Sequence, residues 1–275
     1  MKNKLFTLLL IFVAITLSIT APTSTCFANE IFGDYVADYT EGPGARYSNP
    51  STADSLADGF VDFLINDENN DGYYSENDTT VFGNDSAWAS DYSSDDDTYA
   101  DNADIIFFTG HGFGGSFVFT AEEDEYVLGS SDMSLGDGDA DWLFAFTCNF
   151  TNPVRAHSDL SLYPGSEPFD PDMMNGLHAV CGYKTDMTIT ADSGAYCADY
   201  LTGYGMVEPM TVIQAWRYYG LATQNGSFEN TMRIWYADDC RDDYIWGYGD
   251  VGPDPEPYSD SPSDYSYVDY KLNWN

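Results

Sequence analysis

A histidine between two glycines and a cysteine further along the chain could together carry out nucleophilic chemistry. His111 lies in the stretch Thr-Gly-His-Gly, which ends at Gly112, and Cys148 follows the stretch Phe-Ala-Phe-Thr. A thiol needs a base or a positive neighbour to become a nucleophile near neutral pH, and imidazole can supply that base. Gly112 has no side chain, so its N–H could join that of Cys148 in an oxyanion hole.

Each of these residues also has a structural interpretation. A histidine between glycines suits a tight turn, and Cys148 could equally form a disulfide or be a buried, inert thiol. The chain has five cysteines. If Cys26 is removed with the N-terminal segment, four remain, which is enough for two disulfides with three possible connectivities. Cys197 and Cys240 could pair, whereas Cys181 is predicted to pack in the core.

A second candidate site is an acidic loop at residues 67–78 that has the spacing of an EF-hand calcium loop. Oxygen-bearing side chains fall at loop positions 1, 3, 5, 9 and 12, a backbone carbonyl at 7 and a glycine, Gly72, at 6. Aspartate rather than glutamate at position 12 resembles the calcium loops of dockerin-type and other extracellular modules. The alternative is a solvated acidic turn. The predicted calcium ligands are Asp67, Asn69, Asp71, Tyr73, Ser75 and Asp78.

The candidate site residues lie at the ends of apolar stretches, and these stretches alternate with amphipathic ones. They predict an α/β domain with a mostly parallel sheet. Sites in such sheets form at the carboxyl ends of the strands, so His111 and Cys148 would meet if their strands are parallel neighbours. We expect strands at 31–39, 104–108, 141–147, 176–183 and 231–237, an antiparallel hairpin at 116–128, helices at 51–65, 191–203 and 208–222, and a long loop at 152–172.

The two ends of the chain differ from this pattern. Lys2 and Lys4 precede an apolar run at 5–19, and Cys-Phe-Ala follows at 26–28, so residues 1–28 are predicted to be a secretory signal. The run is too short and too early to predict a stable membrane span. We therefore expect a secreted or cell-surface protein with one domain at 29–250 and an acidic, Pro-, Ser- and Tyr-rich tail at 251–275.

The charge of the chain excludes some partners. The formal net charge is −37 at pH 7. Such a field repels nucleic acid and anionic membrane surfaces, so we expect neither as a partner once the signal is removed. The same acidity suits a saline medium or the binding of divalent cations.

The pattern around His111 and Cys148 resembles that of the caspase-like cysteine peptidases, a group that includes caspases, legumains, gingipains and separases. Members have an apolar block ending in His-Gly and a second apolar block ending in Cys, here "DIIFFTGHG" and "DWLFAFTC". The chain is also similar to a family of exported prokaryotic proteins, through Trp88, Asp91, Tyr92 and "GLHAVCGYKT". The resemblance covers roughly residues 31–250. In this sequence Asn149 and a bulky phenylalanine follow the cysteine, and no residue is assigned to a specificity pocket.

This resemblance implies a caspase-like three-layer α/β sandwich with a mostly parallel central sheet flanked by helices. It also implies a cysteine peptidase acting on a peptide or protein substrate, and the acidic loop at 67–78 adds the expectation that calcium stabilises it. Cys148 would be the nucleophile, His111 the proton donor to the leaving amine, and Gly112 part of the oxyanion hole. His157 and His178 are predicted to be packing or loop residues. The alternative is a non-catalytic extracellular binding module, with which the 22 tyrosines and 6 tryptophans are compatible.

Overall fold

The computed structural model describes residues 29–40, 43–46, 48–66, 73–120, 124–153, 168–203, 208–224, 230–257 and 265–272. The predicted signal segment and the first ligands of the predicted calcium loop lie outside these residues. Among the helices of the described residues, none combines the length and the apolar character needed to cross a membrane.

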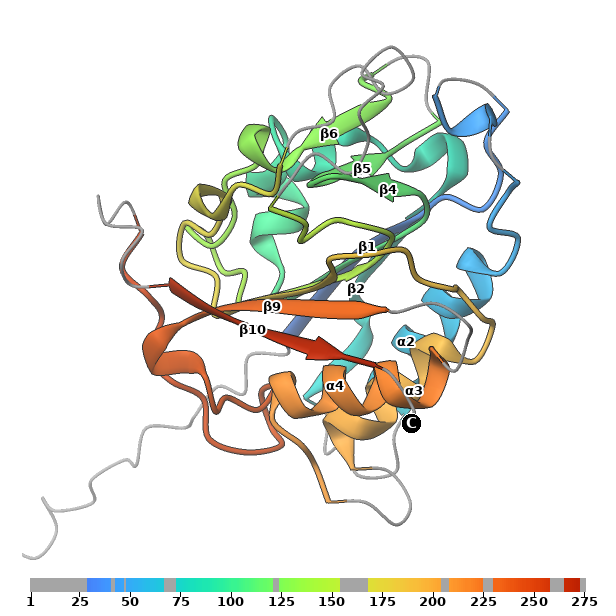
Figure 1. Ribbon diagram of the computed structural model, residues 1–275. Coiled ribbons are helices and arrows are strands. Elements are labelled where there is room, and N and C mark those ends of the chain that lie inside the picture. Colours follow the sequence, from blue (N-terminus) through green and yellow to red (C-terminus); the bar gives the residue numbers. More distant parts are fainter. Residues whose placement is uncertain are drawn as a thin grey trace, which may run out of the picture.

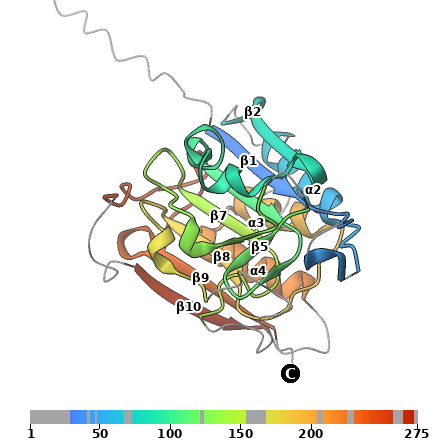
Figure 2. The same cartoon turned by 90° about the horizontal axis from the view of Figure 1, so that it is seen from above.

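A seven-stranded sheet forms the centre of the molecule, with the strand order β10-β9-β8-β7-β3-β1-β2 (Figure 2). The five strands from β8 to β2 in this order are parallel, whereas β9 and β10 run antiparallel to their neighbours. The strands are β1 (Asn29–Tyr35), β2 (Tyr74–Gly83), β3 (Ile105–Thr109), β7 (Trp142–Phe146), β8 (Ala179–Tyr183), β9 (Thr231–Ala237) and β10 (Tyr265–Lys271).

The central strands are apolar throughout because both of their faces are covered. Every residue of β3 and β7 is buried. Side chains alternate between the two faces of a strand, so Ile105 and Phe107 pack in one core cluster and Ile106 and Phe108 in the other. This burial explains why these segments are continuous apolar runs rather than alternating ones.

Three α-helices cover one face of the sheet, below it in Figure 1. Leu56 and Phe60 of the first helix are fully buried, as its amphipathic pattern predicts. The first two helices approach closely at Gly194, where an added Cβ would collide with the carbonyl oxygen of Leu56. The predicted helices are confirmed as α2 (Ala53–Asn66), α3 (Ser193–Thr202) and α4 (Val212–Thr223).

A three-stranded antiparallel sheet and short 3₁₀ turns cover the opposite face (Figure 1). Aromatic rings join this layer to the central sheet, since Phe117 stacks between Phe108 and Phe150 with ring centroids 4.2 Å apart on both sides. The three layers confirm the predicted α/β sandwich. The small sheet consists of β4 (Gly112–Phe113), β5 (Ser116–Val118) and β6 (Val127–Gly129).

Strand β10 lies in a segment that the composition predicts to be an extended tail. Its residues pair along their whole length with β9, from Tyr265 opposite Ala237 to Lys271 opposite Thr231. Asp269 also binds Arg233 of β9 through two hydrogen bonds, of 2.7 and 2.9 Å. Only part of the surface of this edge strand is buried, so its sequence needs few apolar residues. Composition alone therefore did not predict the strand.

Candidate functional site

His111 and Cys148 reach the same edge of the central sheet. Strands β3 and β7 pair in parallel, and the last pair in register is Thr109 with Phe146. His111 lies two residues beyond Thr109, and Cys148 lies two residues beyond Phe146. The two side chains therefore start from the same level at the carboxyl end of adjacent strands, as the sequence predicts.

Contacts beyond the strand ends keep these two segments together. The hydroxyl of Thr147 donates a buried hydrogen bond of 3.0 Å to the carbonyl oxygen of Gly110. A Cβ added to Gly112 would lie 2.9 Å from the carbonyl oxygen of Cys148 and would collide with the Thr147 hydroxyl. Only glycine fits at this position, and its backbone lies against that of Cys148.

Tyr39 supports the half-buried His111. The backbone N–H of His111 donates to the phenol oxygen of Tyr39 at 2.7 Å, and the two rings lie 4.7 Å apart. The imidazole Nε2 lies 3.2 Å from the carbonyl oxygen of Ser48. Burial lowers the pKa of His111, so its imidazole is neutral near pH 7 and can accept a proton.

Cys148 is a free, half-buried thiol that contacts the loop after β8. Its Sγ lies 3.6 Å from the carbonyl oxygen of Met187, to which it donates, and accepts from the N–H of Met187 at 3.3 Å. Burial, together with the nearby carboxylate of Asp186, raises the pKa of Cys148 to about 11 despite the hydrogen bond from Met187. The resting thiol is therefore protonated at neutral pH.

The residue after Cys148 has an unusual backbone conformation. Asn149 has φ 58°, in the left-handed region that few residues other than glycine adopt. Its side-chain amide donates to Asp186 at 2.7 Å, and its backbone N–H donates to Thr185 at 3.0 Å. These two hydrogen bonds hold the left-handed turn that follows the thiol.

The predicted calcium loop is only partly described. Asp67, Asn69 and Asp71 lie outside the described residues, whereas Tyr73, Ser75 and Asp78 lie inside them.

Ser75 and Asp78 belong to β2, at the point where its pairing with β1 shifts register. The hydroxyl of Ser75 donates to the Asp78 carboxylate. Burial, Asp139 and Asp78 raise the pKa of Glu30 on β1, so the end of the loop lies near other acidic groups. Calcium binding by this loop stays a prediction.

The structure does not contain the two disulfides that four cysteines would allow, because all four cysteines of the described residues are free. Cys181 of β8 and Cys197 of α3 pack as apolar residues in the core between the sheet and the helices. Cys240 belongs to a 3₁₀ turn after β9, and its Sγ lies 3.6 Å from the carbonyl oxygen of Pro253. Cys197 and Cys240 therefore do not pair, because the first lies in the core between helices and sheet and the second in a turn at the sheet edge.

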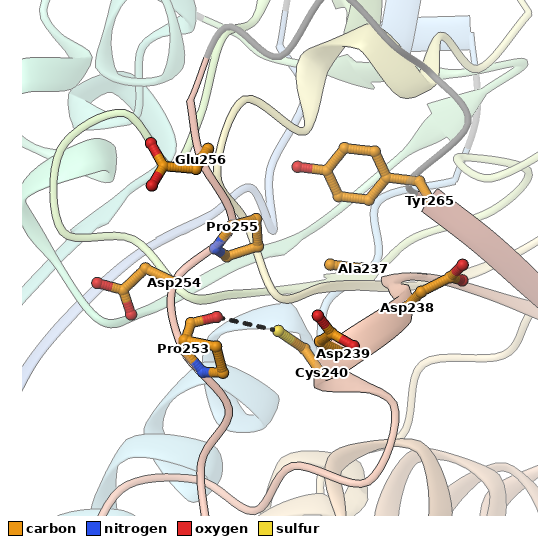
Figure 3. Close-up of a pocket in the computed structure, with 9 residues that line it drawn as sticks. All are labelled: Ala237, Asp238, Asp239, Cys240, Pro253, Asp254, Pro255, Glu256 and Tyr265. Atoms are coloured by element: carbon orange, nitrogen blue, oxygen red, sulfur yellow. Dashed lines mark hydrogen bonds between the residues drawn. The ribbon is translucent and has the colours of Figure 1, made fainter.

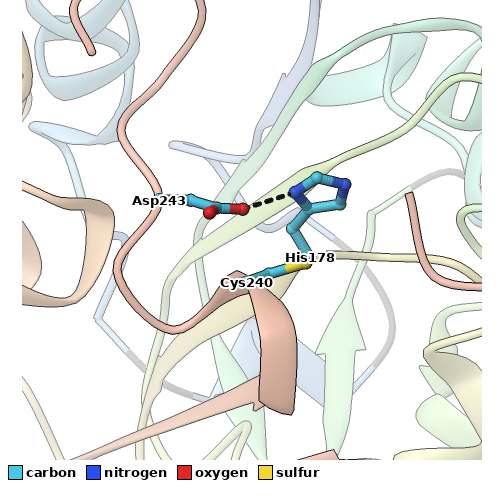
Figure 4. A group of neighbouring side chains, drawn as sticks. All are labelled: His178, Cys240 and Asp243. Atoms are coloured by element: carbon cyan, nitrogen blue, oxygen red, sulfur yellow. Dashed lines mark hydrogen bonds and ion pairs between the residues drawn. The ribbon is translucent and has the colours of Figure 1, made fainter. Parts of the chain in front are cut away.

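A second polar cluster lies at the opposite, amino edge of the sheet. Asp104, Asp141 and His178 stand immediately before β3, β7 and β8. Since these strands are parallel, their preceding residues share one edge. The antiparallel β9 brings Cys240 to the same edge, where it lies near His178 and Asp243 (Figure 4).

Three carboxylates surround the imidazole of His178, which is completely buried. Its Nδ1 lies 2.7 Å from an Asp243 oxygen, and its Nε2 lies 3.3 Å from Asp141 and 3.4 Å from Asp254. Burial alone would lower the pKa of His178, but the Asp243 hydrogen bond and the other carboxylates outweigh it and raise the pKa. Burial raises the pKa of Asp141 to about 7, against the effect of His178.

Two pockets adjoin this cluster, and Asp254 lines both. One, of about 200 Å³, also contacts Asp141 and Trp246. The other, of about 410 Å³, lies between the turn after β9 and the segment that contains Asp254 (Figure 3). Its lining consists of Ala237, Asp238, Asp239, Cys240, Pro253, Asp254, Pro255, Glu256 and Tyr265.

The sequence predicts His178 to be a packing or loop residue. The side chain is buried, as packing requires, but it contacts carboxylates rather than apolar side chains alone. One signal in the sequence could have revealed this edge: three buried strands each follow directly after an aspartate or a histidine. The partners Asp243 and Asp254 follow no such pattern, because they come from the irregular segment after β9.

Comparison with known proteins gives a family assignment. No curated protein matches the chain. The model of a domain of unknown function, DUF6345, matches residues 35–267, which include both polar edges. The chain therefore belongs to the DUF6345 family.

Proposed function

We propose that this protein is an exported cysteine peptidase in which Cys148 is the nucleophile and His111 the general base. The observation that carries the proposal is the register of β3 and β7, which brings both residues to one level at adjacent strand ends. The resemblance to caspase-like peptidases also supports it, because that group has His-Gly and Cys after two such apolar blocks. The apolar N-terminal segment supports export.

The neutral His111 and the protonated Cys148 define the first step. As the sulfur attacks the scissile carbonyl carbon, an S–C bond forms, the carbonyl electron pair moves to oxygen, and the thiol proton passes to the imidazole. The N–H groups of Gly112 and Cys148 stabilise the oxyanion. The intermediate then expels the amine, which takes the proton from His111, and water hydrolyses the thioester with His111 as base.

A peptide library digested by the secreted protein tests this function, with products identified by mass spectrometry. We expect cleavage by the wild type, loss of cleavage in Cys148→Ala, and a decrease of about 10²- to 10⁴-fold in His111→Ala. Cys197→Ala is the matched control, because that thiol is buried in the helix core. Cleavage that survives in Cys148→Ala would rule out this nucleophile.

The proposal includes a calcium ion bound by residues 67–78, which would stabilise the loop between α2 and β2. We expect added calcium to raise Tm and a calcium-selective chelator to lower it. Asp71→Ala should abolish this response, whereas Asp85→Ala, outside the loop, should retain it. If calcium does not change the Tm of the wild type, the proposed stabilisation of this loop by calcium is wrong.

A non-catalytic binding module is the second candidate, and exposed aromatic rings favour it. Tyr196 of α3 and Tyr218 of α4 are 46% and 45% exposed, and the rings of Tyr218 and Tyr200 lie 5.9 Å apart. Exposed aromatic residues commonly contribute to contacts with sugars and proteins. Ligand binding that is lost in Tyr218→Ala but unchanged in Cys148→Ala, without any peptide cleavage, would favour this function.

A further inference from the structure

We propose that His178, Asp141 and Asp254 bind one divalent transition-metal ion, with zinc as the preferred metal. The ligand atoms are the imidazole Nε2 and one carboxylate oxygen from each aspartate, and all three lie within 4.8 Å of one another. This site lies at the amino edge of the sheet, away from the proposed peptidase residues. It is therefore independent of the proposed function.

The two nitrogens of His178 have different environments, and this difference selects Nε2 as the ligand. Nδ1 lies 2.7 Å from an Asp243 oxygen, which is a hydrogen-bond distance and leaves no room for an ion between them. Nε2 is buried and forms no hydrogen bond with any described residue. If Nδ1–H donates to Asp243, the lone pair of Nε2 faces two carboxylate oxygens. Either a proton on Nε2 or a metal ion satisfies this arrangement, because a buried charge must be paired or coordinated.

The distances around Nε2 agree with a tetrahedral site. Zinc binds imidazole nitrogen and carboxylate oxygen at about 2.0–2.1 Å, which separates two tetrahedral ligand atoms by about 3.3 Å. Nε2 lies 3.3 Å from the oxygen of Asp141 and 3.4 Å from that of Asp254. A mixed nitrogen and oxygen ligand set also suits zinc better than calcium, which takes oxygen ligands.

Neighbouring groups orient two of the ligands. Asp243 holds the His178 ring through Nδ1, and its other oxygen accepts from the N–H of Gly252 at 2.9 Å. The indole N–H of Trp246 donates to Asp141 Oδ2, while Asp141 Oδ1 faces His178. A carboxylate behind a ligating histidine is a common outer-shell arrangement that raises the basicity of the ligand and fixes its orientation.

Asp254 is the ligand that opens the site to solvent, and it also belongs to a different segment of the chain from the other two ligands. Its side chain is 82% exposed and lines both neighbouring pockets, so an ion can enter and retain a water ligand. Asp141 precedes β7 and His178 precedes β8, whereas Asp254 comes from the segment between β9 and β10. Metal binding would therefore connect this segment to the edge of the parallel sheet.

Calorimetric titration of the metal-free, full-length protein with Zn²⁺ tests the site. The titration is done at about 0.5 M NaCl, where screening beyond about 4 Å weakens diffuse binding to the acidic surface. We expect one tight ion per chain and a decrease of at least about 10-fold in affinity in Asp254→Asn. Glu256→Gln is the matched control, since it removes the same charge from an exposed residue of the same segment.

Co²⁺ substitution gives a readout that is independent of any activity. We expect visible absorption bands of a tetrahedral ion in the wild type and Glu256→Gln, and their loss in Asp254→Asn. Equal zinc affinity in Asp254→Asn and Glu256→Gln would overturn the proposal, as would displacement of zinc by an equal concentration of calcium. The absence of binding, with NMR showing protons on both nitrogens of His178, would establish an imidazolium ion pair instead.

Discussion

Two histidine and cysteine pairs lie at opposite edges of one sheet, and the charges around them differ. At the carboxyl edge, burial lowers the pKa of His111 and leaves a neutral imidazole. At the amino edge, His178 lies among Asp141, Asp243 and Asp254, and its pKa is raised. The first imidazole suits proton transfer, whereas the second suits an ion pair or a metal.

The two thiols differ in their neighbours as well. Burial raises the pKa of both, to about 11 for Cys148 and further for Cys240. The N–H of Met187 partly offsets the effect at Cys148, whereas Asp243 adds to it at Cys240. The same residue types therefore have different chemistry, because the surrounding charges decide which protonation state is stable.

The largest expected difference between the two edges concerns the thiols. Cys148→Ala should lower kcat/KM for a cleaved peptide by about 10³-fold or more, because it removes the proposed nucleophile. Cys240→Ala should leave kcat/KM near the wild-type value. A fluorogenic peptide chosen from the library measures both. Equal losses in the two variants would show that the edges do not differ in this way.

Removing a carboxylate from each edge should affect stability unequally. Asp243→Asn should lower the free energy of unfolding by about 3 kcal/mol in metal-free buffer, because it breaks a buried pair with His178. Asp186 is an exposed residue at the carboxyl edge, so Asp186→Asn should lower the free energy of unfolding by less than about 1 kcal/mol. Urea unfolding followed by tryptophan fluorescence measures both. A small loss in Asp243→Asn would mean that His178 does not depend on this partner.

The close approach at Gly112 can be tested by adding one methyl group. Gly112→Ala should lower kcat/KM by about 10²-fold, because its Cβ collides with Thr147 and displaces the proposed oxyanion donors. Gly59→Ala in α2 is the control, since its Cβ would make a tight contact of 3.3 Å with the backbone nitrogen of Ala195 but no collision, on a helix that carries none of the proposed site residues. Unchanged peptide cleavage in a folded Gly112→Ala variant would remove the oxyanion role of this residue.

The smallest effect concerns the acidity of Cys148. Its alkylation rate should rise about tenfold per pH unit up to pH 11, because only the thiolate reacts and its pKa is about 11. Asp186→Asn removes a nearby negative charge, lowers this pKa and should increase the rate about two- to threefold at fixed pH. Mass spectrometry at each cysteine measures the rates. A plateau below pH 8 would instead indicate a resting thiolate.

Much of the fold and of the carboxyl edge could be predicted from the sequence. Continuous apolar runs mark β3 and β7, and the positions of His111 and Cys148 at their ends follow from the chain order. The amino edge could not be predicted in the same way. His178 acquires its partners Asp243 and Asp254 from residues 65 and 76 positions away, in a segment without periodicity.

The sequence by itself determined the alternation of helices and strands, since apolar periodicity follows directly from which faces are buried. It also determined which residues stand at the ends of the strands. Only the tertiary structure decided that the four cysteines of the described residues are free, that β10 joins the sheet and that three carboxylates surround His178. The physical reason is that disulfides, edge pairing and local charge depend on distances between segments far apart in the chain, which no local pattern encodes.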